Sequence, residues 1–282
     1  MSQSDSVETV KSLLERSLAL KAFPPLAQLD ERVLTALASH AELRRVRRGA
    51  YLAATEPAPR ALRLVVSGCL HDARRGARYR KHQLVGGPQA LAFGDFEGAL
   101  LAESDVVLLE LEDRWLEALF EDEFTALEAI LRGLARALLD QQSWHQRLTE
   151  PAPRGPMGLV ERVRLLRACP GLGALGIDIL ADLGLEGEHI RLRQGEAWDA
   201  RHTSSYAALL VGELRDASAN AVSAPSLVGW LGALADESRG GRLVARRASE
   251  LMVFDSERFW DRLEDHPDQG VTLVRALARL LD

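Results

Sequence analysis

An internal repeat restricts this 282-residue chain to folds that can be built twice in succession. The matching segments are 21–29 with 167–175, 64–72 with 208–216, and 134–136 with 277–279. The second member of each pair follows the first by 146, 144 and 143 residues, respectively. Because this offset drifts by only three residues across a whole half, we interpret the halves as two copies of one domain with small changes in the loops.

Each half begins with helix signals, continues with short strands and returns to helix. In the first half, apolar residues have helical spacing from about 6 to 23, and Asp30-Glu31 opens a second helix. After His40 the apolar residues alternate between turns marked by glycines, and helical spacing returns from about 113 to 139. The pattern predicts domains that are mainly β with flanking α-helices.

A proline-rich stretch separates the halves. Glu150-Pro-Ala-Pro-Arg-Gly-Pro156 carries three prolines in six residues, which neither a helix nor a central strand accommodates. We therefore predict one domain over 1–150 and a second over 157–282.

Charge and cysteine content limit the functional classes. A net charge of −6 argues against a nucleic-acid coat. Eleven Arg and Lys residues nevertheless fall between Glu42 and Lys81, where they form either a solvated sheet face or a partner site. Cys69 and Cys169 each lie in an apolar run, which favours buried free thiols in a reducing compartment.

Targeting signals are missing from the sequence. The N-terminus has no basic region followed by an apolar core, and no stretch approaches eighteen apolar residues, so we expect neither secretion nor a membrane span. Cytoplasmic localisation is the default expectation. The scarcity of lysine (Lys11, Lys21 and Lys81 only) beside many arginines points to a GC-rich bacterial genome.

Motifs of enzymatic chemistry are also missing. The seven histidines form no His-x-His pair with a nearby Glu, so we predict no metal site. There is no Gly-x-Ser-x-Gly elbow, phosphate-binding loop or dinucleotide-binding glycine pattern, so we predict no catalytic residues and no enzyme. Arg246-Arg-Ala-Ser249 spells a basophilic kinase site, but its position between two strand patterns favours a hairpin corner.

The stretch 229–245, Gly-Trp-Leu-Gly-Ala-Leu-Ala-Asp-Glu-Ser-Arg-Gly-Gly-Arg-Leu-Val-Ala, resembles the phosphate-binding cassette of cyclic-nucleotide-binding domains. In that family, backbone N–H groups and an arginine receive the cyclic phosphate, and a glutamate accepts from the ribose 2′-hydroxyl. The resemblance extends over nearly the whole chain. It implies two tandem double-stranded β-helix (jelly-roll) domains of the cAMP receptor protein or kinase regulatory-subunit type.

The second half has some of the residues that the family uses for ligand binding and lacks others. Gly229, Arg239 and Ala245 occupy the positions of the cassette glycine, the phosphate arginine and the closing alanine, whereas Trp230 replaces the ribose glutamate. Loss of that glutamate costs roughly 1.5–3 kcal/mol of ligand binding. The candidate ligand-binding residues are Gly229, Trp230, Leu231, Arg239, Gly240 and Arg242.

The equivalent cassette of the first half, 86–102, departs further from the family. Gly86 and Ala102 keep its two ends, but Gly87 stands at the glutamate position and Phe96 at the arginine position. A cyclic phosphate without a cation would be an unpaired charge in a partly dry pocket, so we expect no cyclic nucleotide in the first domain.

Two functions remain open. In the first, the chain is a regulatory adaptor with degenerate pockets that binds an unknown protein partner, with the basic residues from Arg44 to Lys81 as one candidate surface. In the second, the 229–245 cassette binds a cyclic nucleotide or another small anion through Arg239 and shifts the helices over 257–281. No resident cofactor and no metal are expected, and exposed apolar helix positions would suit a homodimer. The family's DNA-reading helix-turn-helix and its kinase-inhibitory segment are not expected here.

Overall fold

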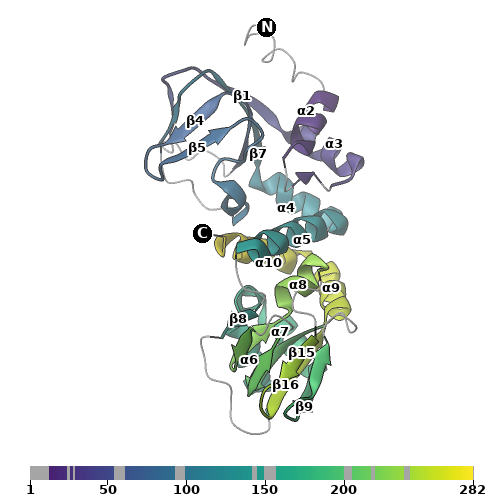
Figure 1. The fold of residues 1–282 in the computed structure, drawn as a ribbon. Coiled ribbons are helices and arrows are strands. Elements are labelled where there is room, and N and C mark those ends of the chain that lie inside the picture. The colour runs from purple at the N-terminus through teal and green to yellow at the C-terminus, as the bar shows by residue number, and fades with distance from the viewer. Residues whose placement is uncertain are drawn as a thin grey trace. The chain divides into compact units, whose positions relative to one another are not determined.

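The computed structural model describes residues 13–23, 26–27, 29–53, 61–92, 99–141, 145–148, 157–199, 205–216, 220–237 and 242–281. The chain divides into two compact units, Met1–Ile130 with Asp282, and Leu131–Leu281. Figure 1 shows helices and antiparallel sheets in both.

The described residues of unit 1 form two α-helices before the strands and two after them. They are α2 (Leu13–Lys21), α3 (Glu31–His40), α4 (Asp113–Asp122) and the first part of α5 (Phe124–Gln141). Asp30 caps α3, as its sequence position predicts, because its Oδ1 accepts from the Val33 N–H at 2.7 Å. The helix signal returning at 113 is confirmed as the two helices α4 and α5.

The strands of unit 1 form two antiparallel sheets around an apolar core. They are β1 (Glu42–Val46), β2 (Tyr51–Ala53), β3 (Ala61–Ser67), β4 (Cys69–Asp72), β5 (Ala77–Arg80), β6 (Ala99–Ala102) and β7 (Val106–Glu112). One sheet has the order β1-β7-β3 and the other β2-β6-β4-β5. Residues that alternate inward along these strands, such as Leu52, Val65, Leu100 and Leu108, fill the space between the sheets.

Unit 2 repeats this succession of elements. Its helices are α6 (Leu159–Arg167), α7 (Ile177–Glu186), α8 (Trp230–Ala235), α9 (Ser256–Asp265) and α10 (Pro267–Arg279). Its strands are β8 (His145–Arg147), β9 (Glu188–Leu192), β10 (Ala197–Asp199), β11 (Ser205–Val211), β12 (Glu213–Arg215), β13 (Ala221–Ser223), β14 (Ser226–Val228), β15 (Arg242–Ala245) and β16 (Ser249–Asp255). The sheet orders are β8-β14-β11-β16-β9 and β10-β15-β12-β13.

Equivalent backbone contacts recur in both units at the offsets of the sequence repeat. The Gly49 N–H donates to the Ala102 carbonyl at 2.8 Å, and the Gly195 N–H donates to the Ala245 carbonyl at 2.8 Å. The ladder of β3 with β7 shifts register between Val65 and Ser67, and that of β11 with β16 shifts between Leu209 and Val211. The same jelly roll is therefore built twice, and the predicted fold class is confirmed.

The predicted domains 1–150 and 157–282 stay a prediction, and the two compact units divide at another point of the chain. The division falls after Ile130, inside α5, and the last part of α5 and β8 belong to unit 2. β8 joins the larger sheet of unit 2 through the pairs His145↔Val228, Gln146↔Leu227 and Arg147↔Ser226. The proline-rich stretch Glu150–Pro156 lies outside the described residues.

None of the helices that the structure describes is both long and apolar enough to cross a lipid bilayer.

Candidate functional site

The described part of the unit 2 cassette is a turn followed by a short buried helix. β14 leads into Gly229, whose φ of 78° is left-handed and suits glycine, and α8 follows. The helix ends at Asp236, which is also left-handed with a φ of 56°. Five of the six residues of α8 are buried, namely Trp230, Leu231, Gly232, Leu234 and Ala235.

Trp230 lies in an aromatic cluster. Its side chain is only 2% exposed, and its ring centroid lies 4.9 Å from that of Tyr206 on β11 and 4.8 Å from that of Phe259 on α9. Tyr206 also stacks on Phe254 at 5.2 Å. Edge-to-face contacts at these distances stabilise aromatic clusters. The position that the resemblance assigns to a ribose-binding carboxylate is thus filled by a core residue.

Two polar atoms are buried inside this cluster without partners. Neither the Trp230 Nε1 nor the Tyr206 hydroxyl has a hydrogen-bond partner among the described residues. Burial raises the pKa of Tyr206 well above its usual value, because the phenolate would lose its hydration. The hydroxyl therefore stays protonated.

Two arginines of α5 bind the C-terminal end of the cassette helix. Arg132 Nη1 lies 3.3 Å from Asp236 Oδ2, and Arg136 Nε lies 3.4 Å from Glu237 Oε1. Arg136 Nη2 also donates to the Ala235 carbonyl at 3.2 Å, where helical carbonyls have no partner within the helix. The sequence analysis did not include Arg132 and Arg136 among the candidate residues. Their spacing of four residues, which places them on one face of a helix, is the sequence signal that could have pointed to them.

The predicted phosphate arginine lies outside the described residues, together with Gly240. Arg242 is described: it begins β15, is exposed, and lies opposite Asp199 in the ladder. Of the six candidate residues, the structure therefore places Gly229, Trp230 and Leu231 together and Arg242 on the strand that follows.

The first cassette has the same beginning and end. Gly86 is left-handed with a φ of 85°, a 3₁₀ turn spans Gly87–Ala92, and Ala102 receives the Gly49 N–H. Phe96, which stands at the arginine position, lies outside the described residues. The expectation that this half binds no cyclic nucleotide stays a prediction.

The two cysteines differ in environment, and the expectation that both are buried is wrong for Cys69. Cys169 is buried and its Sγ donates to the Leu165 carbonyl at 3.3 Å, and burial raises its pKa to about 12. Cys69 is only partly buried, because it faces outward on β4, where its Sγ lies 3.4 Å from Glu103 Oε2. Partial desolvation and Glu103 raise the pKa of this thiol, although Arg80 opposes them.

Other motifs from the sequence have structural roles. Ser249 of the kinase-like motif is 2% exposed and donates to the Arg247 carbonyl at 2.8 Å. The motif lies in the turn between β15 and β16, but these strands belong to different sheets, so the expected hairpin is wrong and the turn is a corner between two sheets. Across the described residues, no group of three or more His, Cys, Asp or Glu side chains could hold a metal ion. Part of the basic stretch is neutralised, since Arg63 pairs with Glu110 and Arg78 with Glu103.

The strand orders, the equivalent turns and the flanking helices define two tandem jelly rolls. No protein-family model matches the chain, and no curated protein matches its sequence.

Solved structures similar to this chain include regulatory parts of protein kinase A. The regulatory domain of Toxoplasma gondii PKA with cAMP is 11% identical, with a TM-score of 0.35, over 95% of this chain and 95% of that chain. The regulatory subunit of a cAMP-independent protein kinase A from Trypanosoma cruzi, bound to guanosine, is 12% identical over 95% and 87%, with a TM-score of 0.33.

A single-domain structure is also similar. The N-terminal domain of a transcriptional regulator from Streptomyces coelicolor A3(2) is 24% identical over 44% of this chain and 94% of that chain, with a TM-score of 0.38. Similarity at these identities concerns the fold alone. What this chain binds is therefore argued from its own residues.

Proposed function

We propose that the chain is a non-enzymatic regulatory adaptor, built from two degenerate cyclic-nucleotide-binding-type domains, whose unit 2 cassette has become a structural element. The observation that carries this proposal is the burial of Trp230 at the position of the ribose carboxylate. A side chain of this size, packed against Tyr206 and Phe259, contributes about 4 to 6 kcal/mol through burial alone. Turning it outward to meet a ligand would sacrifice most of that stabilisation.

The C-terminal end of the same helix supports this proposal. Asp236 and Glu237 bind Arg132 and Arg136, so the loop after α8 begins from an anchored position. An apolar helix fixed at both ends stabilises the unit, whereas a sensor needs a cassette that exchanges between two arrangements.

A nucleotide titration tests the proposal directly. The full chain is titrated with cyclic AMP and cyclic GMP up to several millimolar, with melting temperature and calorimetry as readouts. We expect no heat of binding and no rise in melting temperature. A ligand present at a hundred times its dissociation constant would stabilise the protein by about 2.7 kcal/mol, a shift that is easily measured. Such a shift would contradict the adaptor assignment.

A one-site sensor is the second candidate, and the backbone geometry at the two ends of the cassette favours it. Gly229 retains its left-handed turn, Ala245 still receives the Gly195 N–H, and the exposed Arg242 is available at the start of β15. If a nucleotide or another small anion binds here, Arg239→Ala should abolish the stabilisation while the circular dichroism spectrum stays unchanged. Arg215→Ala, which removes an exposed charge on β12, is the matched control.

The partner of the adaptor is proposed to bind the basic surface of unit 1. Arg47, Arg48 and Lys81 are exposed residues of this surface. Replacing all three by Glu should eliminate capture of the partner in a pull-down, while Arg32→Glu on α3 should leave it unchanged. Equal capture by both variants would place the partner elsewhere.

A further inference from the structure

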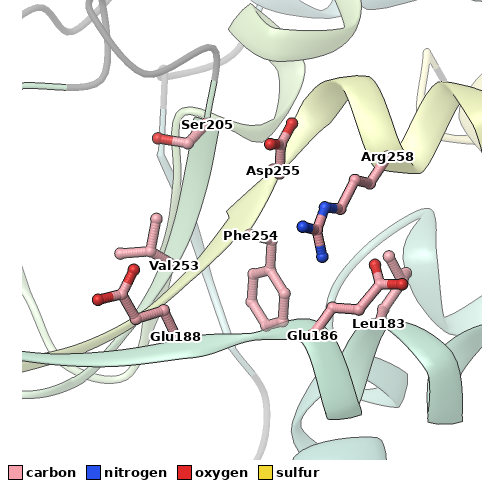
Figure 2. A pocket seen from close by; sticks show the side chains of 8 residues that line it. All are labelled: Leu183, Glu186, Glu188, Ser205, Val253, Phe254, Asp255 and Arg258. Carbon is pink, nitrogen blue, oxygen red and sulfur yellow. The ribbon is translucent and has the colours of Figure 1, made fainter.

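Each unit contains a cleft at the same place in its jelly roll, which we call the sheet-end cleft. In unit 1 it has a volume of about 330 Å³ and lies among α2, the end of α3, the sheet β1-β7-β3 and the start of α4. In unit 2 it has a volume of about 270 Å³ and lies among α7, β9, β11, β16 and α9. Figure 2 shows the unit 2 cleft, with Arg258 extending over it from α9. No cassette residue that the structure describes lines these two clefts.

Six of the eight residues that line the unit 2 cleft have counterparts that line the unit 1 cleft. Unit 1 and unit 2 lining residues correspond at the offsets of the sequence repeat, as His40 with Glu186, Glu42 with Glu188, Ala61 with Ser205, Glu110 with Val253, Glu112 with Asp255, and Trp115 with Arg258. The strand registers agree, because Arg63 pairs with Glu110 on β7 just as Ala207 pairs with Val253 on β16. At these matching positions the backbone is the same, so the clefts differ in the side chains that the positions carry.

The main difference is a charged triad present in unit 1. Arg63 Nε lies 2.8 Å from Glu110 Oε1, and Arg44 Nη1 lies 3.3 Å from the same oxygen. The equivalent residues of unit 2 are Ile190, Ala207 and Val253, which pack in or against its apolar core. Unit 2 thus shows that this fold is complete with three apolar residues at these positions.

Three charged side chains at these partly buried positions are not explained by a gain in the stability of the fold. The side chains of Arg63 and Glu110 are only 16% and 19% exposed, and partly buried ion pairs are often no more stable than apolar residues of similar size. Residues that are unfavourable for stability but present in a cleft are candidates for binding. Because two guanidinium groups share one carboxylate, the triad also retains one positive charge.

A third arginine adds to that positive charge. Arg16 of α2 lines the cleft and donates through Nη1 to the Ala41 carbonyl at 2.9 Å, while its buried Nε has no partner among the described residues. Of the acidic residues that line the cleft, Glu112 does not cancel this positive charge, because it pairs with Arg114 at 2.6 Å. Glu42 is exposed at the beginning of β1.

One wall of the cleft is aromatic. The rings of His40 and Trp115 stack with centroids 3.7 Å apart and planes inclined by 13°. Arg114 lies over the Trp115 ring at 5.1 Å from its centroid. Small-molecule sites typically combine such apolar walls with a few directed polar groups, in volumes from about 300 Å³ upward.

We propose that the sheet-end cleft of unit 1 binds a small planar carboxylate. Its carboxylate group would accept hydrogen bonds from Arg16, Arg44 and Arg63. The planar guanidinium groups of these residues match planar oxyanions in geometry. Its ring would lie against the wall formed by His40 and Trp115. This site is separate from the cassettes and does not depend on the adaptor assignment.

Binding of 4-fluorobenzoate to the full chain, followed by ¹⁹F NMR at constant ionic strength, tests the proposal. We expect saturable broadening of the fluorine signal, and no effect with the neutral 4-fluorobenzamide. The variant Arg44→Ile, Arg63→Ala, Glu110→Val installs the unit 2 residues, so it should fold and weaken binding at least tenfold. Unchanged binding by this folded variant, or equal binding of the amide, would overturn the proposal.

Two single variants keep the test decisive if the triple variant does not fold. Arg44→Gln changes a side chain that is 45% exposed and should weaken binding several-fold. Glu110→Gln removes the carboxylate that competes for both arginines, so it should tighten binding. Inorganic phosphate is the competing probe: displacement of the benzoate by phosphate at lower concentration than by acetate would assign the cleft to phosphate and reject the carboxylate class.

Discussion

Arg136 Nε lies 3.4 Å from Glu237 Oε1, and the same guanidinium donates to the Ala235 carbonyl at 3.2 Å. One side chain of α5 therefore binds both the last residue of α8 and the acidic residue that follows it. The contact satisfies a helix-terminal carbonyl and places a positive charge at the negative end of the helix.

Removal of this contact should loosen the cassette locally. Arg136→Ala is expected to lower the free energy of unfolding by about 1 kcal/mol, because the pair is partly exposed and the carbonyl can recruit water. Hydrogen exchange over 230–237 should become faster. Arg191→Ala, which removes an exposed ion pair with Glu250, is the control and should change stability by less than about 0.5 kcal/mol. Unchanged exchange in Arg136→Ala would show that α8 is held by its apolar contacts alone.

Substitution of Trp230 separates packing from the cost of its unpartnered N–H. Trp230→Ala should lower the free energy of unfolding by about 3 to 5 kcal/mol, since it leaves a cavity beside Tyr206 and Phe259. Trp230→Phe should cost less than about 2 kcal/mol, because the loss of ring area is offset by removal of a buried donor that lacks a partner among the described residues. Urea unfolding measures both. Equal losses would mean that the indole N–H has a partner in solution.

Substitution by alanine at two glycines of unit 2 should lower the free energy of unfolding by very different amounts. A Cβ at Gly212 would lie 2.2 Å from Ser249 Oγ and 2.7 Å from the Ala248 carbonyl oxygen, whereas a Cβ at Gly195 meets nothing within 4 Å. Both have positive φ, so each substitution incurs about 1 to 2 kcal/mol of backbone strain. We expect Gly195→Ala to lose only that amount and Gly212→Ala to exceed about 3 kcal/mol. Thermal unfolding of the two variants provides the comparison.

Thiol labelling should distinguish the cysteines and their pH dependence. Only the thiolate reacts, so a raised pKa lowers reactivity at a given pH. Iodoacetamide at pH 8 should modify Cys69 more slowly than a free thiol and modify Cys169, with its pKa of about 12, only after unfolding. Glu103→Gln removes two of the causes that raise the pKa of Cys69 and leaves Arg80, so labelling should accelerate and its pH profile should move to lower pH. A slower variant would contradict the role of Glu103.

The repeated architecture was predictable because a two-residue period and glycine turns are local signals that occur twice. The offset that relates Gly49 to Gly195 in the sequence also relates their hydrogen bonds to Ala102 and Ala245. Asp30 could likewise be assigned as a cap, since capping depends on residues three apart.

The environment of the cassette was harder to predict. A tryptophan at a family ligand position reads equally well as a stacking platform or as a core residue, and only the contacts with Tyr206 and Phe259 distinguish these. The arginines of α5 lie about a hundred residues before the carboxylates they bind, so no local pattern links them. The triad of Arg44, Arg63 and Glu110 likewise unites three separate strands.

The position of β8 determines where a fragment that contains unit 2 should begin. A fragment that begins at residue 157, as the proline-rich boundary suggests, would lack His145–Arg147 and would present β14 as a bare edge beside the cassette. Uncovered edges of this kind recruit strands from neighbouring molecules, so such a fragment should self-associate. A fragment that begins at Leu131 keeps both the covering strand and the arginines that hold α8, and is the better choice for ligand screening.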